Sequence, residues 1–403
     1  MKIDTRNVDK FIDSFQLETY KKRKDEIYNL LDHEKMNGWL KPDLSCLDDI
    51  FRIRDRVINN SKCLVVVGIG GSFLGSCALY EMFTPYFKKD KFPIIFAGTS
   101  LSSTYMKELL EYLETVDFSL NVISKSGTTL ETSLTYEAIK KVMEKKYSSL
   151  KMKERIIVTT DPIKGTLRKE ALEEGYDTFE IPSNIGGRYS LLTAAHLFPL
   201  SFCLDIKELI MGYKEGLKRC EEAFSYAVIR RCLFDKGKYV ENFVAYENNW
   251  YYYLEWLKQL FGESEGKNGR GILPISMIHT RDLHSLGQFV QDGNKIMFET
   301  FFKIEQSKEC IINGKNFHDI NKLVEDSVIT AHAAGDVPCI VIESDEVTPK
   351  TIGELSSFFF LSAAFSGYLF EINPFNQPGV DVYKKEVKNN YQKYIASSLL
   401  IEK

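Results

Sequence analysis

The sequence predicts an α/β protein with mostly parallel sheets. The run Cys63–Val67 is apolar at every position and Phe118–Ile123 is largely apolar, as expected of parallel strands buried on both faces. Each run is followed by a polar turn and then by apolar residues at helical spacing. Such alternation is typical of a doubly wound parallel sheet. With 403 residues, 44% of them hydrophobic, the chain is long enough for about two domains with cores of their own.

The elements divide the chain into four segments. Residues 1–60 predict a charged helical cover, because Phe11, Phe15 and Tyr20 recur at helical spacings. Residues 61–200 predict a first lobe, residues 201–236 a helical connection and residues 237–403 a second lobe. The strands expected in the first lobe are Cys63–Val67, Phe92–Ala97, Phe118–Ile123, Arg155–Thr159 and Asp177–Ile181.

The second lobe is harder to interpret, because its first apolar residues are mostly aromatic. Strands are expected at Ile296–Phe302 and Cys339–Glu343, and helices at Asn321–Ala334 and Thr351–Glu371. A rigid turn around Pro374 and Pro378 leads into a last helix.

Composition limits the function to small-molecule chemistry. A formal charge of -4 gives no electrostatic reason to expect nucleic-acid or membrane binding. The eight cysteines are scattered without metal-ligand spacing, so we expect reduced thiols and no metal. The N-terminus lacks a signal-peptide core and no apolar run reaches bilayer length, so we expect a cytoplasmic protein.

Two strand-to-helix turns are suited to an anion. The turn Ser124–Thr129 offers hydroxyls, Lys125 and Gly127 beside the unpaired N–H groups of a helix start. The turn Gly68–Gly75 contains Ser72 but lacks the dinucleotide and P-loop patterns. Both turns follow parallel strands, so they face one crevice. The alternatives are that Thr128 and Glu131 form a capping box, and that the glycines only allow close helix packing.

Further along the chain, side chains suited to proton transfer stand among glycines. Gly186 and Gly187 precede Arg188, whose guanidinium is expected to reach the crevice. Glu263 and Glu265 lie at a helix end, and His284 follows Asp282. Isolated residues of these types are more often solvated carboxylates and structural histidines, and His196 is interpreted as structural.

Six motifs in this order resemble the phosphoglucose isomerase family, of the shorter bacterial type. They span most of the chain: Gly68–Ser72, Ser124–Thr129, Gly186–Ser190, Gly262–Lys267, Asp282–Gln288 and Asn376–Val380. The resemblance implies two αβα-sandwich sugar-isomerase (SIS-type) lobes and a homodimer. It also implies interconversion of glucose 6-phosphate and fructose 6-phosphate, by ring opening and a cis-enediolate, without a cofactor.

The resemblance also implies roles for residues of this chain. Glu263 would be the proton-transfer base, with Glu265 as the alternative, and Arg188 would stabilise the enediolate. His284, supplied by the opposite subunit, and Lys384 would open the sugar ring. The residues implied in phosphate binding are Ser72, Ser124, Lys125, Ser126, Thr129 and Gln259, and those implied in other substrate contacts are Gly71, Gly187 and Gln377. The competing functions are an isomerase of another phosphosugar with the same fold and a non-catalytic phosphosugar-binding regulator.

Overall fold

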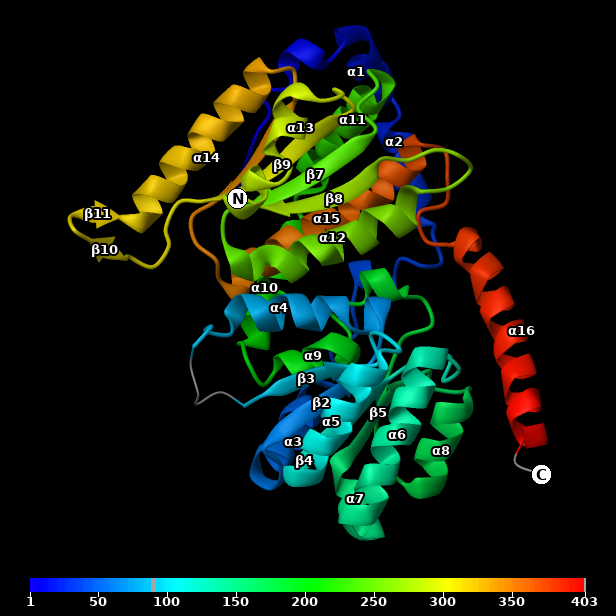
Figure 1. Cartoon of the computed structure of the whole chain (residues 1–403). Coiled ribbons are helices and arrows are strands. Elements are labelled where there is room, and N and C mark those ends of the chain that lie inside the picture. Colours follow the sequence, from blue (N-terminus) through cyan, green and yellow to red (C-terminus); the bar gives the residue numbers. More distant parts are fainter. Residues whose placement is uncertain (88–91, 402–403) are drawn as a thin grey trace.

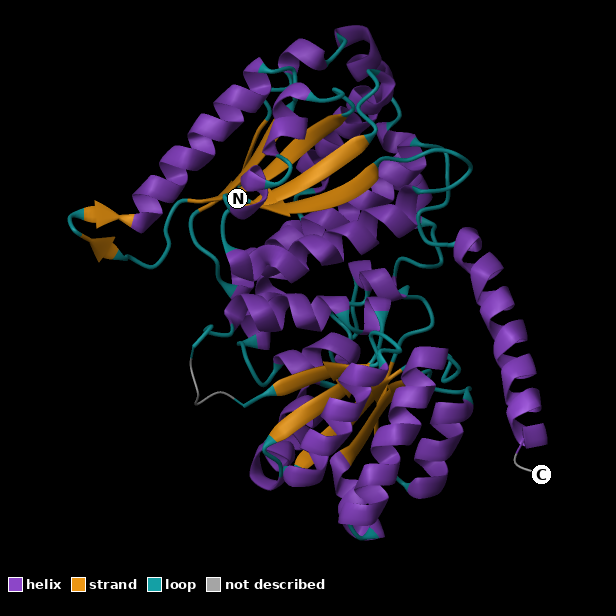
Figure 2. Cartoon of the chain, in the orientation of Figure 1, coloured by secondary structure: helices purple, strands orange, loops and turns teal. Residues whose placement is uncertain are grey.

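The computed structural model describes residues 1–87 and 92–401, which form two lobes (Figure 1). Each lobe is built on a five-stranded sheet with helices packed against it (Figure 2). The predicted α/β class with mostly parallel sheets is confirmed.

The sheet of the first lobe is parallel throughout and has the strand order β3-β2-β4-β5-β6. Strand order reverses between the neighbours β2 and β4, and ligands of such sheets collect beyond the carboxyl ends of the strands at this point. The strands are β2 (Cys63–Val67), β3 (Ile94–Ala97), β4 (Phe118–Ile123), β5 (Ile156–Thr160) and β6 (Asp177–Glu180). The helices are α4 (Leu74–Phe83), α5 (Ser103–Thr115), α6 (Leu130–Lys146), α7 (Ser149–Arg155), α8 (Thr166–Glu174) and α9 (Ala194–Leu200).

The sheet of the second lobe has the order β1-β12-β9-β7-β8, and only the edge strand β1 is antiparallel. Its strands are β1 (Lys2–Asp4), β7 (Val240–Ala245), β8 (Leu273–Ile278), β9 (Met297–Ile304) and β12 (Cys339–Ser344). Its helices are α12 (Tyr251–Glu265), α13 (Gly287–Asp292), α14 (Phe317–Ala334), α15 (Pro349–Leu369) and α16 (Pro378–Ile401). A small hairpin joins β10 (Ile311–Ile312) to β11 (Lys315–Asn316).

The N-terminal segment, expected to be a helical cover, is not entirely helical. Its first residues form β1, which pairs with β12 at the far end of the chain. The helices that follow are α1 (Ser14–Lys21), α2 (Lys24–Asp32) and α3 (Leu47–Asn60). Helix α1 packs on the connecting helix α11 (Cys220–Asp235), α2 packs on α15, and α3 packs on α9 of the first lobe. The segment therefore covers both lobes.

The lobes meet where α4 packs against α12 in the middle of the molecule (Figure 1). The segment predicted as a helical connection, residues 201–236, holds two helices, α10 (Ile206–Leu217) and α11, and both pack on α15. Helix α15 is the one described helix that is long and apolar enough to cross a membrane. Within the protein, 94% of its most apolar 18-residue stretch is buried, as is typical of a core helix.

Helices α10 and α15 approach closely because glycines line their contact. A Cβ atom on Gly212 would lie 1.7 Å from the carbonyl oxygen of Lys350, and one on Gly353 would lie 2.1 Å from that of Leu209. Neither atom can be accommodated without moving backbone, so these positions require glycine for packing rather than for a turn.

Replacing Gly212 by alanine is expected to destabilise the protein by about 1–3 kcal/mol, because the added methyl overpacks a rigid helix contact. The free energy of unfolding in urea measures the loss. Gly379→Ala is the matched control, because a Cβ on this helical glycine meets nothing within 4 Å. That control is expected to leave stability unchanged or raise it slightly, and equal destabilisation in both variants would contradict the packing argument.

Candidate active site

Two turns follow the carboxyl ends of the neighbouring strands β2 and β4, at the point where the strand order reverses. A short 3₁₀ turn, Gly70–Ser72, follows β2, and the segment Ser124–Thr129 follows β4. Gly70 and Gly127 have φ angles of +57° and +69°, which side chains rarely allow, so each turn requires its glycine for conformation.

The Ser124–Thr129 segment is folded by its own hydroxyls. Ser124 Oγ accepts the N–H of Gly127 at 3.1 Å, and Ser126 Oγ accepts the N–H of Thr128 at 3.2 Å. Helix α6 begins after Thr129, whose side chain makes no capping hydrogen bond. The residue at the N-cap position is therefore Thr129 and not Thr128, so the alternative of a Thr128–Glu131 capping box is wrong. The first N–H groups of α6 have no hydrogen bond from a capping side chain.

Lys125 is used differently from the expected phosphate-binding charge. Its Nζ donates to the carbonyl oxygens of Pro182, Ser183 and Ile185 at 3.2, 3.1 and 3.2 Å. An ammonium has three N–H donors, so these contacts occupy all of them. Burial lowers the pKa of Lys125. Its side chain thus ties the Ser124–Thr129 segment to the loop after β6 that leads into Arg188.

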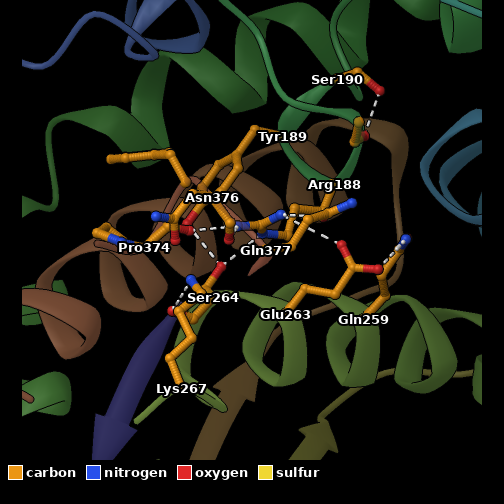
Figure 3. Close-up of polar contacts among 12 residues, drawn as sticks. Arg188, Tyr189, Ser190, Gln259, Glu263, Ser264, Lys267, Pro374, Asn376 and Gln377 are labelled. Atoms are coloured by element: carbon orange, nitrogen blue, oxygen red, sulfur yellow. Dashed lines mark hydrogen bonds and ion pairs between the residues drawn. The ribbon is translucent and has the colours of Figure 1, made fainter. Parts of the chain in front are cut away.

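Arg188 lies at the centre of the cluster, with its side chain only 3% exposed (Figure 3). Its Nε donates to Ser264 Oγ at 2.9 Å, and its Nη1 faces Glu263 Oε2 at 3.3 Å and Gln377 Oε1 at 3.0 Å. Its Nη2 donates to the carbonyl oxygens of Pro374 and Asn376 at 2.5 and 3.2 Å. One buried guanidinium therefore joins the Gly187–Tyr189 turn to the end of α12 and to the turn before α16.

The two glutamates at the end of α12 have opposite environments. Glu263 is 30% exposed, and its second oxygen, Oε1, accepts from Gln259 Nε2 at 3.3 Å (Figure 3). Glu265 is fully buried in an ion pair with Arg230, which also pairs with Glu241. Glu265 Oε2 accepts the N–H of Ile272 at 3.1 Å. Only Glu263 has a carboxylate that faces the Arg188 cluster.

The turn before α16 is anchored by Lys267, a contact that sequence reasoning missed. Lys267 Nζ donates to the carbonyl oxygens of Ser264 and Asn373 at 3.0 and 2.5 Å. Burial, with the nearby charge of Arg188, lowers the pKa of Lys267 to about 7. The Gly262–Lys267 motif contained the signal, since its lysine and serine stand beside the chosen glutamate.

The Gly70–Ser72 turn packs against the Gly187 backbone and the Gln259 side chain. A Cβ on Gly71 would fall 2.3 Å from the carbonyl carbon of Gly187, so the two turns touch through their backbones. A Cβ on Gly70 would fall 3.0 Å from Gln259 Nε2. The fold thus brings together six of the predicted site residues beside Ser72: Gly71, Gly187, Arg188, Gln259, Glu263 and Gln377.

Two predicted catalytic residues are not brought to this cluster within one chain. His284 is exposed at the end of the 3₁₀ turn Arg281–His284, which follows β8. Lys384 is exposed on α16, which extends away from the body of the protein (Figure 1). In residues 1–87 and 92–401, neither side chain has a hydrogen bond to Arg188 or Glu263.

Comparison with known proteins relates most of the chain to one family. The sequence profile of the phosphoglucose isomerase family matches residues 55–230 and 237–401. A glucose-6-phosphate isomerase of Clostridium tetani is 42% identical over 383 residues, covering 87% of this chain and 85% of the relative. One from Alkaliphilus metalliredigens is 40% identical over 426 residues, covering 96% and 94%.

Solved structures agree in fold. A hypothetical protein from Thermus thermophilus superposes with a TM-score of 0.87 at 25% identity, over 97% of this chain and 99% of that one. A glucose-6-phosphate isomerase from Chlamydia trachomatis superposes with a TM-score of 0.78 at 18% identity, over 94% and 86% of the two chains.

Gly71→Ala is expected to weaken binding of an unreactive hexitol 6-phosphate by about tenfold or more, because a Cβ would push the Gly70–Ser72 turn away from the Gly187 backbone. Isothermal titration calorimetry measures the affinity. Gly186→Ala is the control, since a Cβ there meets nothing within 4 Å, and it should bind the hexitol 6-phosphate like the unaltered protein. Unchanged hexitol 6-phosphate affinity in Gly71→Ala would contradict the importance of this contact.

Proposed function

The chain belongs to the phosphoglucose isomerase family, and we propose that the Arg188–Glu263 cluster is where it moves a proton between two carbons of its substrate. The protein interconverts glucose 6-phosphate and fructose 6-phosphate. The observation that carries the site assignment is the partly exposed Glu263 carboxylate, held between Gln259 and a buried arginine.

Glu263 is proposed as the base that carries the proton between C1 and C2. A carboxylate within hydrogen-bond reach of both carbons can take the proton from one and return it to the other. Its two hydrogen-bonded oxygens fix its orientation on the last turn of α12, a rigid element. We do not propose Glu265 as the base, because its carboxylate pairs with Arg230 in the interior.

Arg188 is proposed to stabilise the negative charge of the cis-enediolate. Its guanidinium stays charged and does not compete for the transferred proton. All five of its N–H groups have acceptors in this structure, and the contact to Glu263 is the longest at 3.3 Å. The Nη1 group is therefore the one that we expect to turn from Glu263 towards a substrate oxygen.

The phosphate group is proposed to lie between the Gly70–Ser72 turn and the start of α6. The side chains proposed to hold it are Ser72, Ser124, Ser126 and Thr129, with Gln259 at the edge. Lys125 would contribute through its backbone N–H, because its ammonium is bound to three carbonyl oxygens. The unpaired N–H groups at the start of α6 favour an anion at this place.

Ring opening is proposed to need a second copy of the chain. His284 carries an imidazole, a group that can accept and donate the proton of a sugar hydroxyl, but it is exposed and makes no hydrogen bond to Glu263. Lys384 is proposed as its partner near the ring oxygen. In a homodimer His284 would come from the opposite subunit, so each site would be completed by two chains.

Exposed apolar side chains support the homodimer. Every described side chain from Asp381 to Ser397 on α16 is exposed, except the half-buried Tyr391. Isolated helices gain little stability in water, so a helix of this kind is expected to pack against a partner. Large apolar side chains are also exposed on α14 and just before and within α13, at Phe317, Ile320, Leu323, Leu286 and Phe289.

The predicted cytoplasmic location stays a prediction.

Glu263→Gln is expected to lower kcat by about 10²–10⁴-fold, because it removes the basic carboxylate while keeping its shape. The affinity for a phosphosugar should stay within about tenfold. A coupled spectrophotometric assay follows turnover, and NMR follows hydrogen exchange at C2 in D₂O. Retained exchange would refute the assignment.

Glu265→Gln is the matched variant two residues along the chain. It is expected to keep its kcat at low temperature but to lose about 3 kcal/mol of stability, because it breaks a buried ion pair with Arg230. Loss of activity in a folded Glu265→Gln protein would favour the other glutamate as the base.

Mixed dimers test whether His284 acts across the subunit interface. Glu263→Gln and His284→Ala proteins are each expected to be nearly inactive. When they are unfolded together, mixed in equal amounts and refolded, about one quarter of the unaltered activity should return, since half of the dimers would contain one intact site of two. No recovery would mean that His284 and Glu263 act within the same chain.

A further inference from the structure

His196, interpreted from the sequence as structural, lies between the Gly70–Ser72 turn and the Gly187–Tyr189 turn of the proposed site. It belongs to α9 and is 2% exposed. Its imidazole touches the start of α4, where a Cβ on Gly75 would lie 3.1 Å from its Cε1 atom. The ring therefore fills the space where the Gly70–Ser72 turn and the Gly187–Tyr189 turn come together.

The hydrogen bonds of His196 determine which nitrogen carries the proton. Nδ1 lies 3.0 Å from the backbone nitrogen of Ser76, which can only donate, so Nδ1 is an acceptor. Nε2 then carries the hydrogen and donates to the carbonyl oxygen of Gly71 at 2.8 Å. Burial lowers the pKa of His196 to about 4, so the ring stays neutral and keeps this arrangement near neutral pH.

Ser190 extends the same connection to the arginine turn. Its Oγ lies 3.1 Å from His196 Nε2 and donates to the carbonyl oxygen of Gly187 at 2.6 Å. Gly71 and Gly187 are the residues whose backbones touch. One neutral imidazole thus contacts, directly or through one hydroxyl, both of the carbonyl groups at that contact.

We propose that His196 is a positioning residue that sets the distance between Ser72, at the phosphate end of the substrate, and Arg188, at the reacting carbons. This inference rests on the proposed function. A hexose phosphate must touch both turns at once, so a shift of either turn relative to the other misplaces C1 and C2 when the phosphate is bound. Inorganic phosphate touches only one end of that span.

Two near-isosteric variants separate this role from simple support of the core. His196→Gln places an amide N–H near the position of Nε2 and keeps the bond to the Gly71 carbonyl. His196→Asn places its amide oxygen near the position of Nδ1, so it keeps the bond to Ser76 and loses the one to Gly71. Each variant loses one buried hydrogen bond, so a purely structural role predicts similar effects of both.

The readouts are calorimetric affinities for inorganic phosphate and for a hexitol 6-phosphate, which spans the site but cannot react, together with KM and kcat. We expect His196→Asn to bind the hexitol 6-phosphate about tenfold or more weakly and to lose kcat, with phosphate affinity within about threefold. His196→Gln should retain hexitol 6-phosphate affinity within about threefold. Thermal unfolding confirms that both variants are folded at the assay temperature.

Three results would overturn the positioning role. The first is an equal loss of hexitol 6-phosphate affinity in the Gln and Asn variants. The second is hexitol 6-phosphate binding in His196→Asn that matches the unaltered protein. The third is a loss of hexitol 6-phosphate affinity in His196→Asn that is no larger than its loss of inorganic phosphate affinity. An unaltered protein that binds neither ligand would instead refute the proposed phosphate site, and the inference with it.

Discussion

The buried guanidinium of Arg188 is the interaction on which the rest of the site depends. Removing a positive charge from water is costly, and the structure compensates it with acceptors for all five N–H groups. Those acceptors come from α12 and from the turn before α16, segments of the second lobe, whereas Arg188 itself follows the first sheet. The charge can be satisfied only when both lobes are in place, so assembly of the site and docking of the lobes are one event.

Much of the first lobe could be predicted from the sequence because its strands are buried on both faces. Parallel strands of this kind are apolar at almost every position, as in β2, and the expected and observed ends of its strands differ by at most two residues. The strands β7 and β8 were missed. Strand β7 carries Glu241 and Asn242 in its interior, and a buried carboxylate looks like a surface residue until its partner, Arg230, is known. Arg230 lies on helix α11, so the contacts of the folded chain, rather than the local sequence, explain why this segment forms a strand.

The candidate site, like the fold, has parts that the local sequence predicts and parts that it does not. Local motifs were enough to place the two glycine-containing turns, Gly70–Ser72 and Ser124–Thr129, at strand ends, because glycines and hydroxyls at strand ends have local conformational causes. Pattern alone left Glu263 and Glu265 as alternatives, since the two differ only in what surrounds them in the folded chain. Three carbonyl groups bind the Lys125 ammonium, and His196 lies between the Gly70–Ser72 turn and the Gly187–Tyr189 turn; both arrangements depend on segments that are distant in sequence. Neither could be deduced from spacing.

The edge strand β1 has a consequence for synthesis on the ribosome. Lys2 pairs with Glu343, 341 residues away, so β1 leaves the ribosome long before its neighbour exists. At translation rates of about 5–20 residues per second, the interval is roughly 20–70 s. The first lobe can fold in that time, whereas the second sheet gains its antiparallel border only after β12 (Cys339–Ser344) has been made. That border leaves an edge of the finished sheet only three residues long, which limits unwanted strand pairing with other molecules.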